Sequence, residues 1–316
     1  MYTAVNENTS FLLIDTRVDN QHIMTPSYEI YSNTLRAPDE GNFYGCPLLV
    51  GNTMLMFGGG FDQRQIAEIY SWGSSITRRI GSLLFQFKRG TCLYNNEMFY
   101  FCFGMDLSGA NFLGAVEETT CRHRYWYHTI NFCVSIIIFS SDLVNYGIYP
   151  RTSESHLYGA IDIFNNNLVA IGGGWYNATM EMLINERHWL LVPNFGDFLD
   201  FSGGKLLKFT TLVIPRNSSD LLYIFGGNYY DHNYDNIVVD KVWLYDNITW
   251  TPATPLMRPL SGHYTALVGE NVIHYGGSYN YDGFSISKWK LENETFLRPV
   301  EFVELPGITL SGRSRG

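Results

Sequence analysis

The densest group of side chains that could bind a ligand lies in the segment Asn228–Asn236, which reads NYYDHNYDN. Its carboxylates, Asp231 and Asp235, are hard oxygen ligands of the kind that Ca²⁺ takes in proteins. However, the segment lacks the ligand spacing of an EF-hand loop, and a polar surface loop rich in tyrosine explains it as well. We therefore expect no cofactor, with Asp231 and Asp235 as the candidate ligands if a metal binds.

Residues that could support catalysis do not form a recognisable set. His263, His274 and Tyr275 are residue types found in copper sites, but His274 falls inside an apolar run, and we interpret His263 as structural. The sequence has no G-x-S-x-G nucleophile elbow and no Walker A loop. The glycine runs at Gly58–Phe61 and Gly172–Trp175 precede no helical pattern, so they lack the helix N-terminus that binds phosphate. We predict that the protein is not an enzyme.

Aromatic side chains gather in the loops that follow three glycine pairs. Tyrosine and tryptophan provide contact area at low entropic cost, and loops on a rigid scaffold commonly carry recognition. The candidate binding residues are Trp175, Tyr176, Tyr229, Tyr230, Tyr234, Tyr279 and Tyr281. A protein or a glycan is the expected partner. The same loops could instead pack over neighbouring parts of the fold, and the sequence leaves both readings open.

Asn-x-Ser/Thr sequons fall in predicted turns or near a terminus, where a glycan would be tolerated. The candidate glycosylation sites are Asn8, Asn177, Asn217, Asn247 and Asn293. Their positions favour an extracellular or secreted protein. The segment Met1–Ser10 is polar and lacks the apolar region of a signal peptide, so a cytoplasmic location is the alternative.

Four of the five cysteines, Cys92, Cys102, Cys121 and Cys133, fall one per predicted strand of a single repeat. This spacing is what disulfide partners on neighbouring strands would show, although buried free thiols are the alternative. Cys46 is left over from this scheme.

The composition argues against two classes of partner. The net charge is −9 and no basic stripe is visible, so duplex nucleic acid is an unsuitable ligand. The most apolar window, Phe132–Phe139, is far shorter than the roughly 20 residues that cross a bilayer, so we expect no membrane insertion.

Most of these candidate residues lie within a repeat, in which an apolar run ends in a pair of glycines. The copies are Met54–Gly59, Leu168–Gly173, Leu222–Gly227 and Val272–Gly277, with a degenerate one at Phe99–Gly104. Each predicts a buried strand that ends where backbones crowd together or take positive φ. A period of roughly 50 residues is typical of propellers and arrays.

A second pattern follows each glycine pair. The residues Ile184…Trp189, Tyr245…Trp250 and Leu291…Phe296 flank turn residues in a way that predicts β-hairpins. Each repeat thus supplies two strands before its loop and two after it, and we expect a four-stranded antiparallel sheet.

The repeat resembles the kelch motif, in which a glycine pair is followed by Tyr and Trp and then by Arg…His. The copy at Leu221–Met257, continued by Arg258–His263, carries the resemblance best, and the whole likeness covers Phe43 to about Phe296. It implies an all-β, kelch-type β-propeller. The stretch Gln65–Phe87 also resembles uncharacterised, secreted kelch-like proteins of invertebrates.

Repeats start near Phe43, Arg89, His156, Phe209 and His263. An open ring would expose sheet edges, so we expect six blades, the last built from strands at both termini. The segments Phe11–Arg17, His22–Ile30 and Phe302–Leu310 would supply it, and seven blades is the alternative. We expect one propeller domain over 1–310 and a C-terminal tail over 311–316.

These expectations combine into one functional hypothesis. The protein is a non-catalytic extracellular propeller that acts as a binding or structural module, in a fibre or matrix for example, with self-association left open. An intracellular kelch adaptor for protein partners is the alternative, followed by a propeller enzyme acting on carbohydrate.

Overall fold

The computed structural model describes most strands of the chain and the turns between many of them. The described residues are 11–15, 20–24, 30–34, 46–50, 53–58, 65–69, 77–82, 91–95, 98–102, 105–106, 123–125, 128–132, 136–140, 146–148, 150, 152–153, 156, 158–173, 179–193, 195, 206–230, 235–278, 285–292 and 296–304. Every element whose bounds are defined is a β-strand, and the fold is all-β.

The first half of the chain forms four antiparallel sheets. The first contains β1 (Phe11–Asp15), β2 (Asn20–Met24) and β3 (Ile30–Thr34). The second contains β4 (Cys46–Val50), β5 (Thr53–Phe57), β6 (Gln65–Ile69) and β7 (Thr77–Ser82). The third contains β8 (Thr91–Asn95), β9 (Met98–Cys102), β13 (Ile136–Ser140) and β14 (Tyr146–Ile148). Between β9 and β13 the chain forms a smaller sheet of β10 (Met105–Asp106), β11 (His123–Tyr125) and β12 (His128–Phe132).

The second half repeats the four-stranded unit three times. One sheet contains β15 (Ala160–Phe164), β16 (Asn167–Ile171), β17 (Met180–Ile184) and β18 (His188–Leu191). The next contains β19 (Thr210–Ile214), β20 (Leu221–Phe225), β23 (Val242–Tyr245) and β24 (Trp250–Pro252), with β21 (Asn228–Tyr230) and β22 (Asn236–Val238) as an inserted hairpin. The last contains β25 (Ser261–Val268), β26 (Asn271–Ser278), β27 (Ser285–Glu292) and β28 (Phe296–Glu304).

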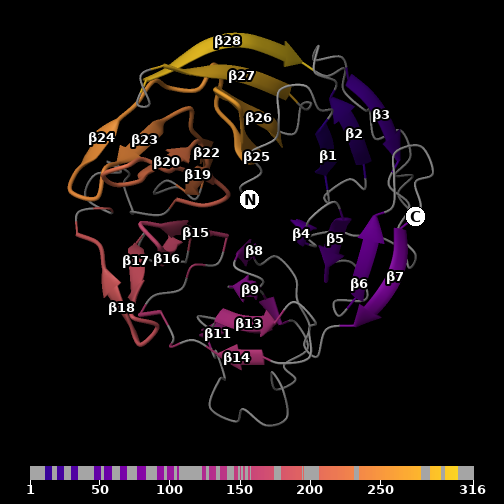
Figure 1. Cartoon of the computed structure of the whole chain (residues 1–316), viewed down its shortest axis with the longest axis vertical. Coiled ribbons are helices and arrows are strands. Elements are labelled where there is room, and N and C mark those ends of the chain that lie inside the picture. Colours follow the sequence, from indigo (N-terminus) through magenta and orange to yellow (C-terminus); the bar gives the residue numbers. More distant parts are fainter. Residues whose placement is uncertain are drawn as a thin grey trace.

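The sheets are arranged around a common centre (Figure 1). The five four-stranded sheets and the sheet of β1–β3 follow one another in chain order, and the first strand of each four-stranded sheet lies nearest the centre. Neighbouring inner strands are in contact: β4 with β8, β8 with β15, β15 with β19, and β19 with β25. The arrangement is propeller-like.

The structure confirms the predicted four-stranded antiparallel units. Their first strands begin at Cys46, Thr91, Ala160, Thr210 and Ser261, close to the repeat starts expected from the sequence. The hairpin registers agree to within one residue. Tyr245 pairs with Trp250 as expected, whereas Ile184 pairs with His188 and Leu291 with Leu297.

Only the first residues of the predicted C-terminal closing strand, Phe302–Leu310, lie within the part of the chain that the structure describes. The predicted start of that strand is wrong, because Phe302 lies in β28 and pairs with Ser287 of β27, within the sheet of β25–β28. Residues 305–316, which include the rest of that strand and the tail, lie outside the described residues. Closure of the ring by both termini therefore stays a prediction.

Successive sheets pack face to face through apolar side chains. In β20 every residue is buried, and alternate residues serve different neighbours. Leu222 and Ile224 belong to the cluster shared with β15–β18, while Leu221, Tyr223 and Phe225 belong to the cluster shared with β25–β28. This two-sided burial explains why the strands before the glycine pairs read as continuous apolar runs.

The glycine pairs lie where one sheet meets the chain entering the next. Gly172, Gly173, Gly226 and Gly227 all have positive φ, between 55° and 102°. The Gly173 N–H donates to the carbonyl of Leu206 (2.8 Å), and the Gly227 N–H donates to that of Leu260 (2.7 Å). The pairs therefore join neighbouring sheets, which is the crowding that their sequence predicted.

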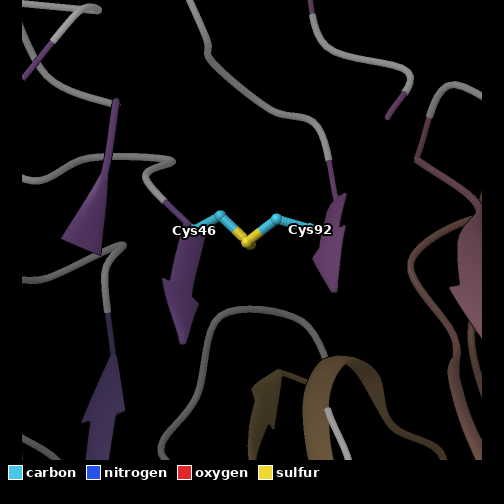
Figure 2. Close-up of a disulfide and its surroundings, with 2 residues drawn as sticks. All are labelled: Cys46 and Cys92. Carbon is cyan, nitrogen blue, oxygen red and sulfur yellow. A yellow bond between two sulfur atoms is a disulfide. The ribbon is translucent and has the colours of Figure 1, made fainter. Parts of the chain in front are cut away.

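The disulfide joins Cys46 of β4 to Cys92 of β8 (Figure 2), with 6.1 Å between the Cα atoms. It links two neighbouring sheets through their inner strands, so the expectation that Cys46 is left over is wrong. Cys121 and Cys133, two of the expected partners, lie outside the described residues.

Strand register explains why Cys92 does not pair with Cys102. Cys92 lies opposite Phe101 on β9, and Cys102 lies opposite Thr91, one position along the ladder. Side chains one position apart point to opposite faces of a sheet, so the two sulfur atoms cannot meet. Cys102 is a buried free thiol packed with residues of β15–β18, and burial raises the pKa of that thiol.

Candidate functional site

Strand direction assigns each connection to one of two faces of the propeller-like arrangement. Each four-stranded sheet is antiparallel, so its second strand ends on the side where its first strand begins. We call this side the doublet face, because the glycine pairs lie there, as the bonds from Gly173 to Leu206 and from Gly227 to Leu260 show. The opposite side, the hairpin face, carries the turns between first and second strands and between third and fourth strands.

Direct contacts also join turns on the hairpin face. The Asn165 N–H donates to Asp220 Oδ2 (2.7 Å), and the Asp220 N–H donates to Asn165 Oδ1 (2.8 Å). These residues lie in the β15–β16 turn and in the β19–β20 turn, so two adjacent sheets are held together at this end as well.

The loop that carries the densest polar and aromatic sequence forms the β21–β22 hairpin on the doublet face. Asn228 pairs with Val238, and Tyr230 pairs with Asn236. Inside the hairpin, Asn228 Nδ2 donates to Asn236 Oδ1 (2.5 Å). At its base, Asn228 and Leu207 exchange two backbone hydrogen bonds of 2.8 Å each. The hairpin is thus anchored to the segment that enters β19.

The hairpin separates two of the candidate binding residues. Tyr229 is half-buried against the core cluster of β15–β24, whereas the next residue, Tyr230, is 39% exposed. Consecutive strand residues point to opposite sides, so one tyrosine anchors the hairpin while the other faces solvent. The candidates Trp175, Tyr176, Tyr234, Tyr279 and Tyr281 lie outside the described residues.

The same hairpin includes the candidate calcium ligands. Asp235 is exposed beside the first residue of β22, and Asp231 lies outside the described residues. Among the residues that the structure describes, no three histidine, cysteine or acidic side chains come together as a metal-binding group.

A belt of backbone hydrogen bonds, missed in the sequence, lies where the inner strands begin. The Lys208 N–H donates to the Tyr158 carbonyl (2.8 Å), and the Gly262 N–H donates to the Lys208 carbonyl (2.6 Å). All three residues have positive φ, at 62°, 54° and 64° for Tyr158, Lys208 and Gly262. The Lys208 ammonium lies 5.8 Å from the centroid of the Tyr158 ring. Left-handed φ at non-glycine residues leaves no signal in sequence, and it costs about 1–3 kcal/mol at each position.

A buried chain of hydroxyl and imidazole groups crosses the interface between β19 and the last sheet. His263 Nε2 is 3.0 Å from Thr210 Oγ1, which is 2.5 Å from Thr265 Oγ1, and Thr265 Oγ1 is 2.8 Å from His274 Nδ1. Three hydrogen bonds need three protons and the hydroxyls supply two, so at least one facing imidazole nitrogen carries a hydrogen. The structure places His263 and His274 in a packing interface.

Burial, followed by the nearby His263, lowers the pKa of His274 well below its ordinary value. Folding therefore favours the neutral imidazole. The stabilisation from His274 is fully present above the unfolded pKa of about 6.5, and it is lost as the pH falls below that value. We expect the free energy of unfolding to decrease by about 1 kcal/mol between pH 6.5 and 5.5 through this group. The decrease should be absent from His274→Gln, as urea unfolding at both pH values would show. Equal pH dependence in the two proteins would contradict the assignment.

A second buried histidine, also missed in the sequence, ties the segment entering β15 to its sheet. His156 Nδ1 donates to the Gly172 carbonyl (2.7 Å), so its Nε2 faces Glu181 Oε1 (3.1 Å). Glu181 Oε2 accepts from the Ser153 N–H (2.8 Å), and both side chains are fully buried. A hydrogen bond between Nε2 and Oε1 needs one hydrogen, carried by one of these two atoms. The pair is enclosed by protein, and its contacts are those of a structural latch.

Two of the five sequons lie within the described residues, and both are on the hairpin face. Asn217 is exposed in the β19–β20 turn, and Asn247 is exposed in the β23–β24 turn. Asn8, Asn177 and Asn293 lie outside the described residues.

Comparison with known proteins identifies the fold and leaves the family open. No family model matches the chain, and no curated protein matches it. Among solved structures 203 chains match. One of them, titled "Structure of YjhT", is 12% identical, with 95% of this chain and 99% of that chain covered and a TM-score of 0.66. At that identity the likeness shows the fold alone. Within the described residues, no helix is long and apolar enough to cross a membrane.

Proposed function

We propose that this chain is a kelch-type β-propeller of six blades that acts outside the cell as a non-catalytic binding module. A protein or glycan partner binds its doublet face. The observation that carries the proposal is Tyr230, an exposed aromatic side chain on a hairpin that two backbone hydrogen bonds anchor at Leu207. A rigidly presented aromatic residue loses little entropy when it is buried by a partner.

The sheet order supports six blades over seven. The strands β10–β12 interrupt the third sheet, because β13 returns to pair with β9 after them. A separate seventh blade would follow β14 instead. The sheet of β1–β3 is then the sixth blade.

The disulfide supports an extracellular location. Disulfides persist in oxidising compartments and are rare in the cytosol, where thiols are kept reduced. The Cys46–Cys92 bond joins the inner strands of two sheets, and Cys92 is 5% exposed. The fold itself brings these two cysteines together, so the disulfide is part of the folded structure.

Three buried histidines and the buried Glu181 support a non-catalytic role. His263 and His274 bond to threonines within a sheet interface, and His156 bonds to Glu181 beneath the segment that enters β15. These side chains are at most 3% exposed, so they do not face a substrate.

The test of the proposal is binding through Tyr230. The purified protein is offered to a printed array of neutral and acidic oligosaccharides and to immobilised extracellular proteins of its own source. Loss of a central aromatic contact costs about 2 kcal/mol, so Tyr230→Ala should weaken binding about thirtyfold. Ile248→Ala, an exposed position on the hairpin face, is the control and should bind as the wild type does. Equal binding by Tyr230→Ala and wild type, or no binding at all, would overturn the role of this face.

A further inference from the structure

On the hairpin face, two exposed asparagine amides have no hydrogen-bond partner among the described residues. They belong to Asn217 and Asn247. Two other asparagines of these sheets do have amide partners: Asn165 Nδ2 donates to Ser219 Oγ, and Asn228 Nδ2 donates to Asn236 Oδ1. A glycosylated asparagine must reach solvent in the folded protein, because the attached sugar needs room there.

The turn around Asn247 is built to project that side chain. The Asp246 carboxylate accepts from the Ile248 N–H (2.9 Å) and from the Thr249 N–H (2.7 Å). The Thr249 hydroxyl lies 3.3 Å from both carboxylate oxygens. The hydrogen bond from the Thr249 N–H is the main reason that the pKa of Asp246 is lowered. Asn247 itself has a φ of 79°, a left-handed conformation that asparagine tolerates.

An exposed apolar side chain accompanies this sequon. Ile248, at 83% exposure, is far more exposed than the other large apolar side chains described. The corresponding turn of the preceding sheet, between β17 and β18, has Asn185 exposed with a φ of 51°, but Glu186 and Arg187 follow it. That turn has no sequon and no apolar side chain at its tip. The pairing of sequon and bare isoleucine is what a turn covered by a sugar would show.

We propose that Asn247 and Asn217 carry N-linked oligosaccharides, which lie on the hairpin face, opposite the face that presents Tyr230. The proposal rests on the extracellular function proposed above. In the transfer, Nδ2 of the asparagine forms a bond to C1 of the first sugar of a lipid-linked oligosaccharide pyrophosphate. The C1–O bond breaks, the lipid pyrophosphate leaves with the electron pair, and the Nδ2 proton passes to a base of the transferase.

The test is intact mass of the full chain secreted from a eukaryotic host, before and after enzymatic removal of N-glycans. Asn247→Gln and Asn217→Gln should each lose the mass of one glycan. Thr249→Ala keeps Asn247 but removes the sequon, and it should lose the same glycan as Asn247→Gln. Arg187→Thr creates a sequon at Asn185 in the matching turn, and it should gain one glycan.

The outcomes separate this proposal from the proposed function. Secreted protein with an intact Cys46–Cys92 bond but unmodified Asn217 and Asn247 would overturn the glycan assignment alone. Glycosylation of Arg187→Thr at Asn185 without glycosylation at Asn247 would do the same and would show that the face is accessible. Native protein recovered from cytosol with both cysteines reduced would overturn the extracellular function, whatever the secreted protein carries.

Discussion

Replacing Gly173 with alanine should lower the free energy of unfolding by about 4 kcal/mol. A Cβ atom at this position would lie 2.6 Å from the backbone nitrogen of Gly159 and 2.6 Å from the carbonyl carbon of His156. Both neighbours are backbone, so neither can rotate away. The φ of 74° adds the cost of a left-handed alanine. Relief would require moving the segment that enters β15, which the His156–Glu181 latch holds in place.

The control for this prediction is Gly269→Ala. Gly269 also has a positive φ, 56°, but it is exposed in the β25–β26 turn. The substitution should cost about 1 kcal/mol, the price of the backbone conformation alone. Urea unfolding of both variants measures the difference. Similar losses at the two positions would show that Gly173 is needed for its φ and that the crowding has no effect.

Removing the Cys46–Cys92 disulfide should destabilise the protein by a similar amount. The two residues are 46 positions apart, and closing a loop of that length in the unfolded chain is worth about 4 kcal/mol at 25 °C. The double variant Cys46→Ala/Cys92→Ala should therefore unfold at a clearly lower denaturant concentration. A reducing agent should bring the wild type close to the variant and leave the variant unchanged.

Cys102→Ala serves as the matched control for the disulfide. Cys102 lies on the strand next to Cys92 but faces the sheet of β15–β18. Its loss should leave the disulfide intact and the response to reductant the same as in the wild type. If the stability of Cys102→Ala no longer responded to reductant, the assignment of the disulfide to Cys46 and Cys92 would be wrong.

Both predictions concern the contacts that hold neighbouring sheets together. Bonds between the inner strands of neighbouring sheets add to the apolar packing that joins those sheets. Between β4 and β8 the bond is a disulfide, and between β15 and β19 it is a hydrogen bond from the Thr211 hydroxyl to Asp162 (3.0 Å). Between β19 and β25 it is the pair of hydrogen bonds that join Thr210 to His263 and to Thr265. Burial raises the pKa of Asp162, which marks the cost of placing a carboxylate there.

The sequence by itself determined the repeating unit of this fold. An apolar run, a glycine pair and a spaced aromatic pair are local signals, because strand burial, positive φ and hairpin turns each depend on a few adjacent residues. They located the first strand of every four-stranded sheet and paired Tyr245 with Trp250 correctly. The exposure of Asn217 and Asn247 was predictable for the same reason, since turn residues lie at the surface.

Only the tertiary structure decided which residues meet between sheets. Spacing along the chain places four of the five cysteines in one sheet. Inner strands of adjacent sheets nevertheless bring Cys46 to Cys92, and a shift of one position turns Cys102 away. The left-handed backbone of Lys208 is also a matter of contact between sheets. Lys208 bonds through its N–H to Tyr158 and through its carbonyl to Gly262, which belong to the sheets on either side. Spacing along the chain sets what a residue can do within its own sheet. Contact between sheets depends on register and on the order of strands around the centre, and no local pattern encodes either.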